Sequence, residues 1–378
     1  VTAQRFGAGD EEGVRRSFAA GILIGGVITV FLTALSVALA RPILILMRTP
    51  ANIIDGAYSY IVVIYAGIAA AVLFNLLSSV LRALGDSRTP LIFLVIACLI
   101  NIGLDFLCIL TFQMGVAGAA VATIAAQLLS GGACIVYIAR RFPMLHLRRE
   151  HWRVTREEIF EHLRVALPMG FQSSIIAIGS IILQFTLNGL GETAVSAYTA
   201  AQKIDLIATQ PMMSFGMTMA TYAAQNYGAG KPDRVKKSYF IALAYSFGAG
   251  LVLGGSLFIF GRQFLALFTT ESAVIDAGMK RVGVMGFAYC ISAFMDCTIA
   301  ASRGLGKTVV PTVIVVLGSC VFRVIWVYTI FAHFHTIPSL YLLYPCSWTL
   351  TAIAEIVYFI HAYKDSMKIF TQPQPAEV

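Results

Sequence analysis

Ten long apolar runs constrain the fold of this chain more than any other feature of its sequence. A helix needs about 20 mostly apolar residues to cross a bilayer, whereas the strands of a membrane barrel alternate with period two over about ten residues. The runs here are long and uniformly apolar. We therefore expect an all-α, polytopic membrane protein whose ten spans lie at roughly 17–40, 56–81, 90–112, 116–139, 163–188, 193–224, 238–261, 277–301, 309–332 and 338–363.

Charge is distributed unevenly over the loops between these runs. Only 12% of the residues are charged, about half the share in a soluble domain, and the net charge is +8. Most of the 27 lysines and arginines fall on the side that holds Val1, and two, Lys203 and Arg323, fall inside runs. Because cytoplasmic loops are enriched in basic residues, we expect both ends in the cytoplasm and no nucleic-acid partner. The opposite side then holds Arg41, Arg48, Arg262, Lys280 and Arg281.

The sequence repeats itself at a constant offset of 221 residues, so that Ala224 corresponds to Ala3, Arg262 to Arg41 and Asp276 to Asp55. Glycine suits the left-handed cap that ends a helix, proline suits a first helical turn, and arginine complements the dipole at a helix C-terminus. Such residues make up most of the structural motif that recurs, which is Gln4, Gly7, Gly9, Arg82, Gly85 and Pro90 in the first copy and Gln225, Gly228, Gly230, Arg303, Gly306 and Pro311 in the second.

The repeat also predicts the domain organisation. Corresponding loops fall on the same side, so each copy holds an even number of helices and the copies are parallel repeats. The two runs within 163–224 have no counterpart upstream, so we expect this chain to lack the first two of twelve helices. The predicted parts are an N-terminal bundle at 1–145 (helices three to six), a cytoplasmic amphipathic linker at 146–162, a C-terminal bundle at 163–364 (helices seven to twelve) and a tail at 365–378.

Several short segments carry motifs that are specific as a set. They are 1–9 and 224–230 at two helix turns, 81–90, 101–105, 115–120, Leu167-Pro168 with Gln172, and Pro345 with Trp348. These segments resemble the MATE (multidrug and toxic compound extrusion) family over essentially the whole chain. The resemblance implies two six-helix bundles forming a V with a central cavity, in the plasma membrane of a bacterial cell. It also implies rocker-switch export of amphipathic organic cations and drugs by a monomer among membrane lipids.

The same resemblance implies that an inward flow of Na⁺ or H⁺ drives export. The first helix, which often carries an acidic coupling residue in bacterial relatives, is absent from this chain. The run from Ala166 to Asn188 contains no acid, although a Na⁺-coupled subgroup has a glutamate there. The choice between the two ions therefore stays open.

The sequence indicates no enzyme and no cofactor. Its seven cysteines form no CxxC pair, so neither a zinc site nor a redox dithiol is expected. The segment 306–308 is similar to the end of a P-loop, but position 301 is alanine where a glycine is required. ATP binding is therefore not expected, and Na⁺ remains the one metal ion to consider.

Polar residues within apolar runs are the candidates for an ion or substrate site, because ionisable groups are costly in a membrane. Asp296 corresponds to Asn75 in the repeat, and Lys203 and Asp205 are two residues apart and so face opposite ways. Our hypothesis is that Asp296 or Asp205 binds the coupling ion. The alternative for each is a structural hydrogen bond or ion pair, and Arg323 is expected to pair with an acid. The full set of candidates is Asp296, Asp205, Gln172, Asn75, Glu355, Lys203 and Asn101.

Two other functions remain as alternatives. A lipid-linked oligosaccharide flippase of the same superfamily has to bind a pyrophosphate, which calls for several basic residues within the spans, and only Lys203 and Arg323 are found there. A non-transporting membrane sensor or membrane-embedded enzyme calls for an appended soluble domain or a catalytic cluster, and the sequence indicates neither.

Overall fold

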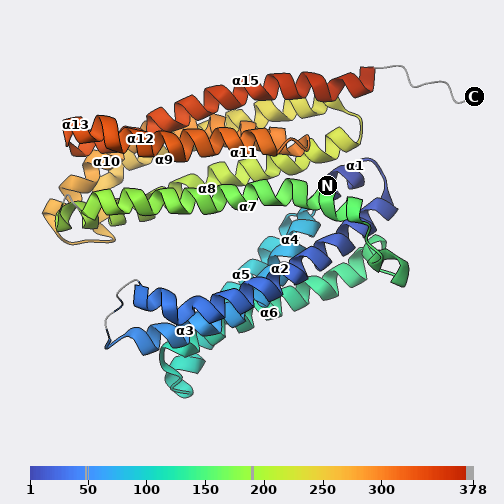
Figure 1. The fold of residues 1–378 in the computed structure, drawn as a ribbon, viewed down its shortest axis with the longest axis horizontal. Coiled ribbons are helices and arrows are strands. Elements are labelled where there is room, and N and C mark those ends of the chain that lie inside the picture. The colour runs from blue at the N-terminus through green and yellow to red at the C-terminus, as the bar shows by residue number, and fades with distance from the viewer. Residues whose placement is uncertain (47–48, 50, 189–190, 372–378) are drawn as a thin grey trace, which may run out of the picture. The chain divides into compact units, whose positions relative to one another are not determined.

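The computed structural model describes residues 1–46, 49, 51–188 and 191–371, and every regular element in that part is a helix. The chain divides into two compact units, Val1–His162 (unit 1) and Leu163–Val378 (unit 2). Figure 1 colours them from blue to green and from green to red. The predicted all-α class is confirmed.

Unit 1 is built on three helices that pack around a small apolar core. Its elements are α1 (Thr2–Gly7), α2 (Glu11–Leu46), α3 (Ile54–Ala66), α4 (Ile68–Ala83), α5 (Arg88–Phe106), a π-helical turn (Leu107–Thr111), α6 (Gly115–Arg141) and two 3₁₀ turns (Pro143–Leu145, Arg149–Trp152). The core joins Val14 and Phe18 of α2 to Leu81 of α4 and Cys134 of α6. Each of these side chains is at most 7% exposed.

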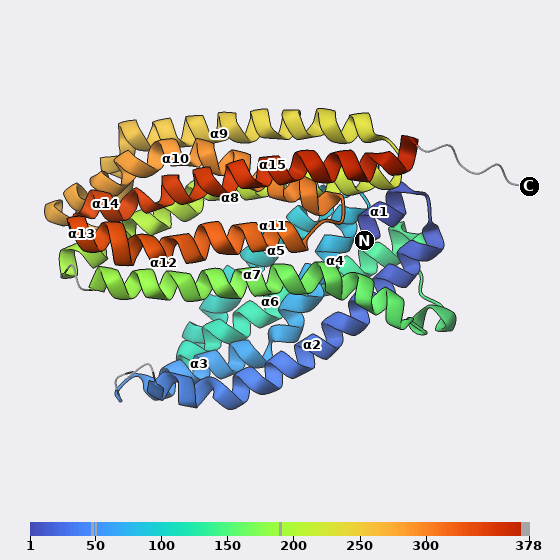
Figure 2. The same cartoon turned by 45° about the horizontal axis from the view of Figure 1, so that its top comes forward.

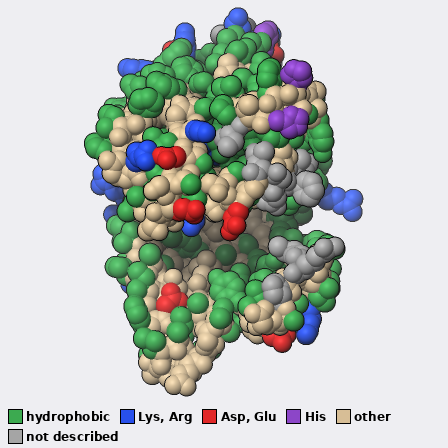
Figure 3. Space-filling model, turned by 90° about the vertical axis from the view of Figure 1, so that its left-hand side faces the viewer, with side chains coloured by type: hydrophobic (Ala, Val, Ile, Leu, Met, Phe, Trp, Pro, Cys, Tyr) green, Lys and Arg blue, Asp and Glu red, His purple; other side chains and the backbone are tan. Residues whose placement is uncertain are grey.

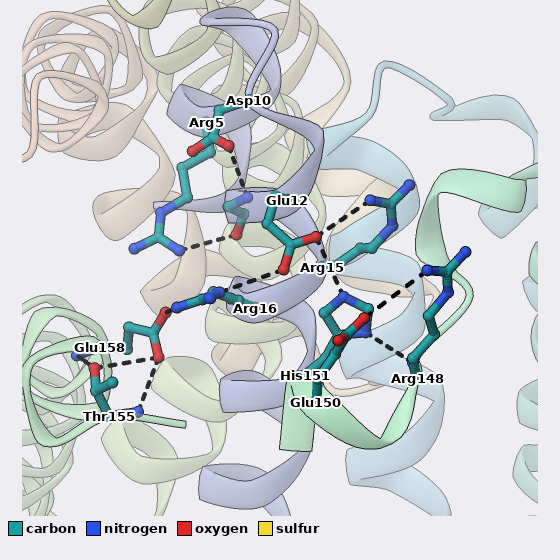
Figure 4. Close-up of polar contacts among 11 residues, drawn as sticks. Arg5, Asp10, Glu12, Arg15, Arg16, Arg148, Glu150, His151, Thr155 and Glu158 are labelled. Atoms are coloured by element: carbon teal, nitrogen blue, oxygen red, sulfur yellow. Dashed lines mark hydrogen bonds and ion pairs between the residues drawn. The ribbon is translucent and has the colours of Figure 1, made fainter. Parts of the chain in front are cut away.

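The predicted linker packs with unit 1 and is held to the start of α2 by side-chain contacts (Figure 4). Buried His151 contacts Glu12 at 3.2 Å, and Arg16 lies 3.7 Å from Glu158 on the first turn of α7 (Arg156–Asn188). Arg5 pairs with Glu161 at 2.6 Å, and the Ser17 hydroxyl lies 2.7 Å from the His162 ring. Because the linker's polar face contacts protein, the amphipathic pattern reflects docking onto unit 1.

Unit 2 is built around α10 (Ser272–Gly304), which packs against α8 (Glu192–Gly228), α9 (Pro232–Ala266) and α15 (Leu343–Thr371). Figure 2 shows α9, α10 and α15 side by side. Gly254 permits the approach of α9 to α10, because a Cβ there would lie 2.0 Å from the carbonyl oxygen of Gly286. Between α10 and α15 the chain forms α11 (Val309–Val316), a π-helical turn (Leu317–Val321), α12 (Phe322–Trp326), a second π-helical turn (Val327–Phe331), α13 (Ala332–Phe334) and α14 (Ile337–Tyr341).

Most of the predicted spans meet the length and hydropathy of a membrane helix. Among the described residues, seven helical segments do so, and α3 with α4 makes an eighth if the pair, bent by 42°, is one span. Helices also cover the predicted spans 163–188 and 193–224, and of these two helices α8 does not reach that hydropathy. Polar side chains such as Gln202 and Asp205 lower it. Figure 3 shows charged side chains as isolated groups among hydrophobic and other ones.

The internal repeat is confirmed in the backbone. Gly9 and Gly230 have φ of 74° and 66°, and Gly85 and Gly306 have φ of 91° and 81°. Corresponding hydrogen bonds close these turns, from Gly85 N to Arg82 O at 3.0 Å and from Gly306 N to Arg303 O at 2.9 Å. A glycine in the left-handed backbone conformation therefore follows the end of the equivalent helix in both units, as expected from the motif.

One ion pair occurs at corresponding positions of the two copies of the repeat. Arg41 lies 3.6 Å from Asp55 in unit 1, and Arg262 lies 2.8 Å from Asp276 in unit 2. All four side chains are more than half exposed. Exposed pairs contribute about 0–1 kcal/mol, so this pair marks the common ancestry of the two copies more than their stability.

Candidate functional site

Arg303 lies at the centre of a polar cluster inside unit 2, which we call the Arg303 cluster and which contains Gln172, Asp296, Arg303 and Glu355. The Arg303 guanidinium donates to the side-chain carbonyl of Gln172 at 2.7 Å, joining α10 to α7. Its charge also interacts with the carboxylates of Glu355 on α15 and Asp296 on α10. Three helices of unit 2 therefore contribute to one cluster around a single cation.

Glu355 is the most deeply buried acid of the cluster, with 0% of the residue exposed. Neither of its carboxylate oxygens has a hydrogen-bond partner in the described part of the chain, and the Nε of Arg303 is also buried and unpartnered. A buried carboxylate without a partner is costly while it is ionised. The geometry therefore suits a residue that takes up a proton or a cation.

Asp296 lies two turns before Arg303 on the same face of α10, and it is half-buried. Its carboxylate makes no hydrogen bond or ion pair within the described residues. Gly216 lets α8 approach this point, because a Cβ there would lie 3.4 Å from the carbonyl oxygen of Asp296. A cation at Asp296 would therefore lie against α8 as well as α10.

Asp205, the second residue of our hypothesis, is not free. It accepts hydrogen bonds from the Nε of Arg281 at 2.9 Å and from the hydroxyl of Tyr289. The prediction that Arg281 belongs to a loop is wrong, because Arg281 is 2% exposed and lies about two and a half turns inside α10. The carboxylate of Asp205 stabilises this buried charge, which hydropathy assigned to the helix end.

One pattern in the sequence does point to this pair. Arg281, Met285, Tyr289 and Ala293 recur at four-residue spacing on α10, and all four are buried. An arginine that continues an apolar stripe at helical spacing faces the protein interior and needs an acid there.

The other candidates lie apart from the Arg303 cluster. Lys203 is exposed, with its ammonium 5.3 Å from the centre of the Phe268 ring, so it faces away from Asp205 as expected. Arg323 has no carboxylate partner among the described residues, so its predicted pairing with an acid is wrong; its Nε instead donates to the Ser347 hydroxyl at 3.3 Å.

Two candidates belong to unit 1. Asn75 is exposed, and its amide donates to the carbonyl of Ala71 on its own helix at 2.8 Å. The amide nitrogen of Asn101 on α5 is buried without a partner among the described residues. Of the predicted set, the structure therefore brings together Gln172, Asp296 and Glu355.

Long apolar helices and a buried charge cluster define a polytopic α-helical membrane protein. Residues 1–107 and 168–329 match the family model described as MatE, so the chain belongs to the MatE family. It is 29% identical over 291 residues to the "Probable multidrug resistance protein YpnP" of Bacillus subtilis, a match that covers 76% of this chain and 64% of that protein.

Two further comparisons bear on the fold and on substrates. The chain is 22% identical to a "FAD transporter" of Shewanella oneidensis, over 68% of this chain and 57% of that protein. A solved structure titled "Crystal structure of MATE in the bent conformation" superimposes with a TM-score of 0.91 at 21% identity, covering 98% of this chain and 83% of that one. The chain thus spans about two thirds of the Bacillus relative's length and has the helical fold of MATE structures.

Proposed function

We propose that this chain forms the larger part of a secondary active multidrug exporter, which antiports amphipathic organic cations or drugs against Na⁺ or H⁺ by rocker-switch alternating access. Membership of the MatE family and relatives named as multidrug resistance proteins support this function. The observation that carries it is Glu355, a fully buried acid whose oxygens lack hydrogen-bond partners in the described structure.

The cluster offers a simple coupling device. When Glu355 is ionised and empty, its charge attracts Arg303 away from Gln172. When Glu355 carries a proton or a cation, that attraction is weaker and Arg303 keeps its 2.7 Å hydrogen bond to α7. A charge-assisted hydrogen bond contributes about 1.5–3 kcal/mol, which is enough to shift a balance between two helix arrangements.

Asp296 serves in this proposal as a second acid for the cation. It shares Arg303 as a neighbouring charge with Glu355 but lies on another helix, so a cation between the two would link α10 to α15. Gln172 orients Arg303 through the 2.7 Å hydrogen bond.

We also propose that both ends of the chain face the cytoplasm, in the plasma membrane of a bacterial cell, and that the protein works as a monomer surrounded by lipid. The concentration of lysine and arginine in the loops on the side of Val1 supports this orientation.

The test is ethidium efflux from cells that express the complete coding sequence, with Na⁺ and pH gradients imposed separately. Efflux should collapse with one gradient and not with the other, which identifies the ion. Glu355→Gln should abolish the response to that gradient, since a glutamine is permanently neutral. The control is Asp365→Asn on the same helix, an exposed acid paired with Lys368, which should keep the response. Full ion-driven efflux by Glu355→Gln would remove Glu355 from the mechanism.

A second candidate is transport of an anionic, phosphate-bearing molecule such as a lipid-linked oligosaccharide. Arg281 favours it, because unit 2 buries one more cation than the apolar runs indicated. A relative named as a transporter of FAD is consistent with such a substrate. Absence of ethidium efflux under either gradient, with the protein folded in the membrane, would favour this candidate or a non-transporting role.

A further inference from the structure

Arg281 is enclosed by tyrosines from α8, α14 and α15. Its guanidinium lies 4.3 Å from the ring centre of Tyr198, 5.3 Å from that of Tyr341 and 5.0 Å from that of Tyr344. These three rings are at most 9% exposed. We call this group the tyrosine box.

A second arginine borders the tyrosine box without an acid of its own. The guanidinium of Arg323, on α12, lies 4.7 Å from the ring centre of Tyr344. Asp205 neutralises Arg281 through a 2.9 Å hydrogen bond, and no further carboxylate of the described chain pairs with either arginine. Two cations inside unit 2, the buried Arg281 and the half-buried Arg323, therefore share one anion, which leaves one positive charge in excess.

An uncompensated charge inside a membrane protein costs several kcal/mol. The tyrosine faces offset only part of that cost, since a cation–π contact contributes about 0.5–2 kcal/mol. The hydrogen bond from Arg323 to Ser347 supplies no negative charge. An anion beside Arg323 would restore electroneutrality.

A cavity of about 40 Å³ lies beside Arg323. Its polar lining is Ser180 from α7, Ser319 from the π-helical turn and Tyr344 from α15. The Ser319 residue is 6% exposed, and its hydroxyl makes no hydrogen bond within the described residues. Ser180 and Tyr344 already bond to Ala177 and Tyr198, so Ser319 is the donor that remains available.

The size of the cavity restricts what it can hold. A water molecule takes up about 30 Å³ in the liquid, so this space fits one monatomic ion or one water and no organic group. Gly179 allows α7 to pack closely against the π-helical turn beside the cavity, because a Cβ there would lie 3.0 Å from the Sγ of Cys320.

We propose that the cavity beside Arg323 binds a small monovalent anion such as chloride, held by the Arg323 guanidinium and the Ser319 hydroxyl. The ion balances the charge of Arg323 and links α12 to the π-helical turn, in a cavity that α7 and α15 also line. This site is separate from the Arg303 cluster and does not depend on what the protein transports.

The first experiment measures thermal unfolding of the purified full-length protein in detergent. Chloride is exchanged for gluconate, which is too large for the cavity, at constant Na⁺ concentration and ionic strength. The unfolding temperature should rise with chloride in a saturable way, and bromide should substitute for chloride. Arg323→Gln should remove the dependence. Arg262→Gln, which removes an exposed arginine of the same unit, should retain it.

Ser319→Ala keeps the fold and the charge and removes one hydrogen-bond donor to the anion. It therefore tests the site even if the Arg323→Gln variant fails to fold. Its midpoint for chloride should rise about tenfold, the equivalent of one hydrogen bond to a charged group. Crystals grown in bromide should show one anomalous peak in contact with Arg323.

Three results would overturn the proposal. They are equal unfolding temperatures in chloride and gluconate, a chloride dependence that survives Arg323→Gln, and a bromide-grown crystal with no anomalous peak in the cavity. The last result would mean that water alone fills the site.

Discussion

The two units use the same turns to carry different side chains. Left-handed glycines end α4 and α10 at equivalent positions, and each unit has one ion pair in the same register. Inside the corresponding helices, however, Asn75 corresponds to Asp296 and Tyr60 corresponds to Arg281. The repeat preserves what shapes the backbone, whereas Asp296 and Arg281 have no charged counterpart in unit 1.

Arg82 and Arg303 show the same divergence at one shared residue. Arg82 donates to the Ser79 hydroxyl on its own helix at 2.9 Å, so it acts locally. Arg303 reaches Gln172, 131 residues away in the chain, and faces two carboxylates. A residue kept for its place in a motif has thus gained a tertiary role in one copy only.

The largest effect should come from breaking the buried ion pair of unit 2 and comparing it with the exposed pair. Asp205→Asn leaves Arg281 buried without a counter-ion and should cost about 3–5 kcal/mol of stability. Asp276→Asn breaks the exposed pair with Arg262 and should cost less than about 1 kcal/mol. Denaturant unfolding in detergent measures both. If the two variants lose similar amounts of unfolding free energy, the buried pair of Asp205 and Arg281 contributes no more to stability than the exposed pair.

The next largest effect should be a difference in efflux between variants of Arg303 and of its counterpart Arg82. Arg303→Gln removes a hydrogen bond to a neighbouring helix and the cation that faces two acids, so ion-driven efflux should fall tenfold or more. Arg82→Gln removes a bond within its own helix and should lower efflux less than about threefold. Efflux rates at matched protein levels in the membrane make the comparison. If the two variants lose efflux equally, both arginines serve the structure of the turn and neither takes part in ion coupling.

The features predicted correctly from the sequence depend on local patterns. Hydropathy identifies most spans because each one buries itself in lipid without help from distant residues. The repeated turns follow from single glycines, since φ values of 81° to 91° at Gly85 and Gly306 suit no other residue as well.

The contacts within the candidate site are not local, and hydropathy does not report them. Asp205 and Arg281 are 76 residues apart, and neither helix alone shows that the two meet. The same pattern that identified Asp296 and Glu355 as acids within apolar runs gave no reason to join them through Arg303. It also made α8 look like an ordinary span, although its polar residues lower its hydropathy.

A smaller effect should show where the two units remain equivalent. Gly85→Ala and Gly306→Ala each force a side chain into the left-handed region, at φ of 91° and 81°. Each should cost about 1–2 kcal/mol, and the two costs should agree closely. Thermal unfolding of the single variants measures them. A loss confined to one glycine would mean that the matching backbone hydrogen bonds do not imply matching roles.

The smallest effect should arise in the linker, which has no counterpart in the repeat. Burial lowers the pKa of His162, whose ring lies 2.7 Å from the Ser17 hydroxyl, so the folded protein favours the neutral ring. Below about pH 6.5 the unfolded chain binds a proton that the folded chain resists. The stability of the docked linker should therefore be complete above that pH and fall as the solution is acidified toward pH 5.5.

Limited proteolysis within 146–162 at pH 7.5 and pH 5.5 measures this release. Cleavage should be faster at the lower pH, His162→Gln should reduce the difference, and His146→Gln, which replaces an exposed histidine of the same linker, should leave it unchanged. A pH difference that persists in His162→Gln would assign the response to the ion pairs around Glu12 and Arg16. In that case the linker would be held mainly by charge at the start of α2, and its docking would weaken with salt as well as with acid.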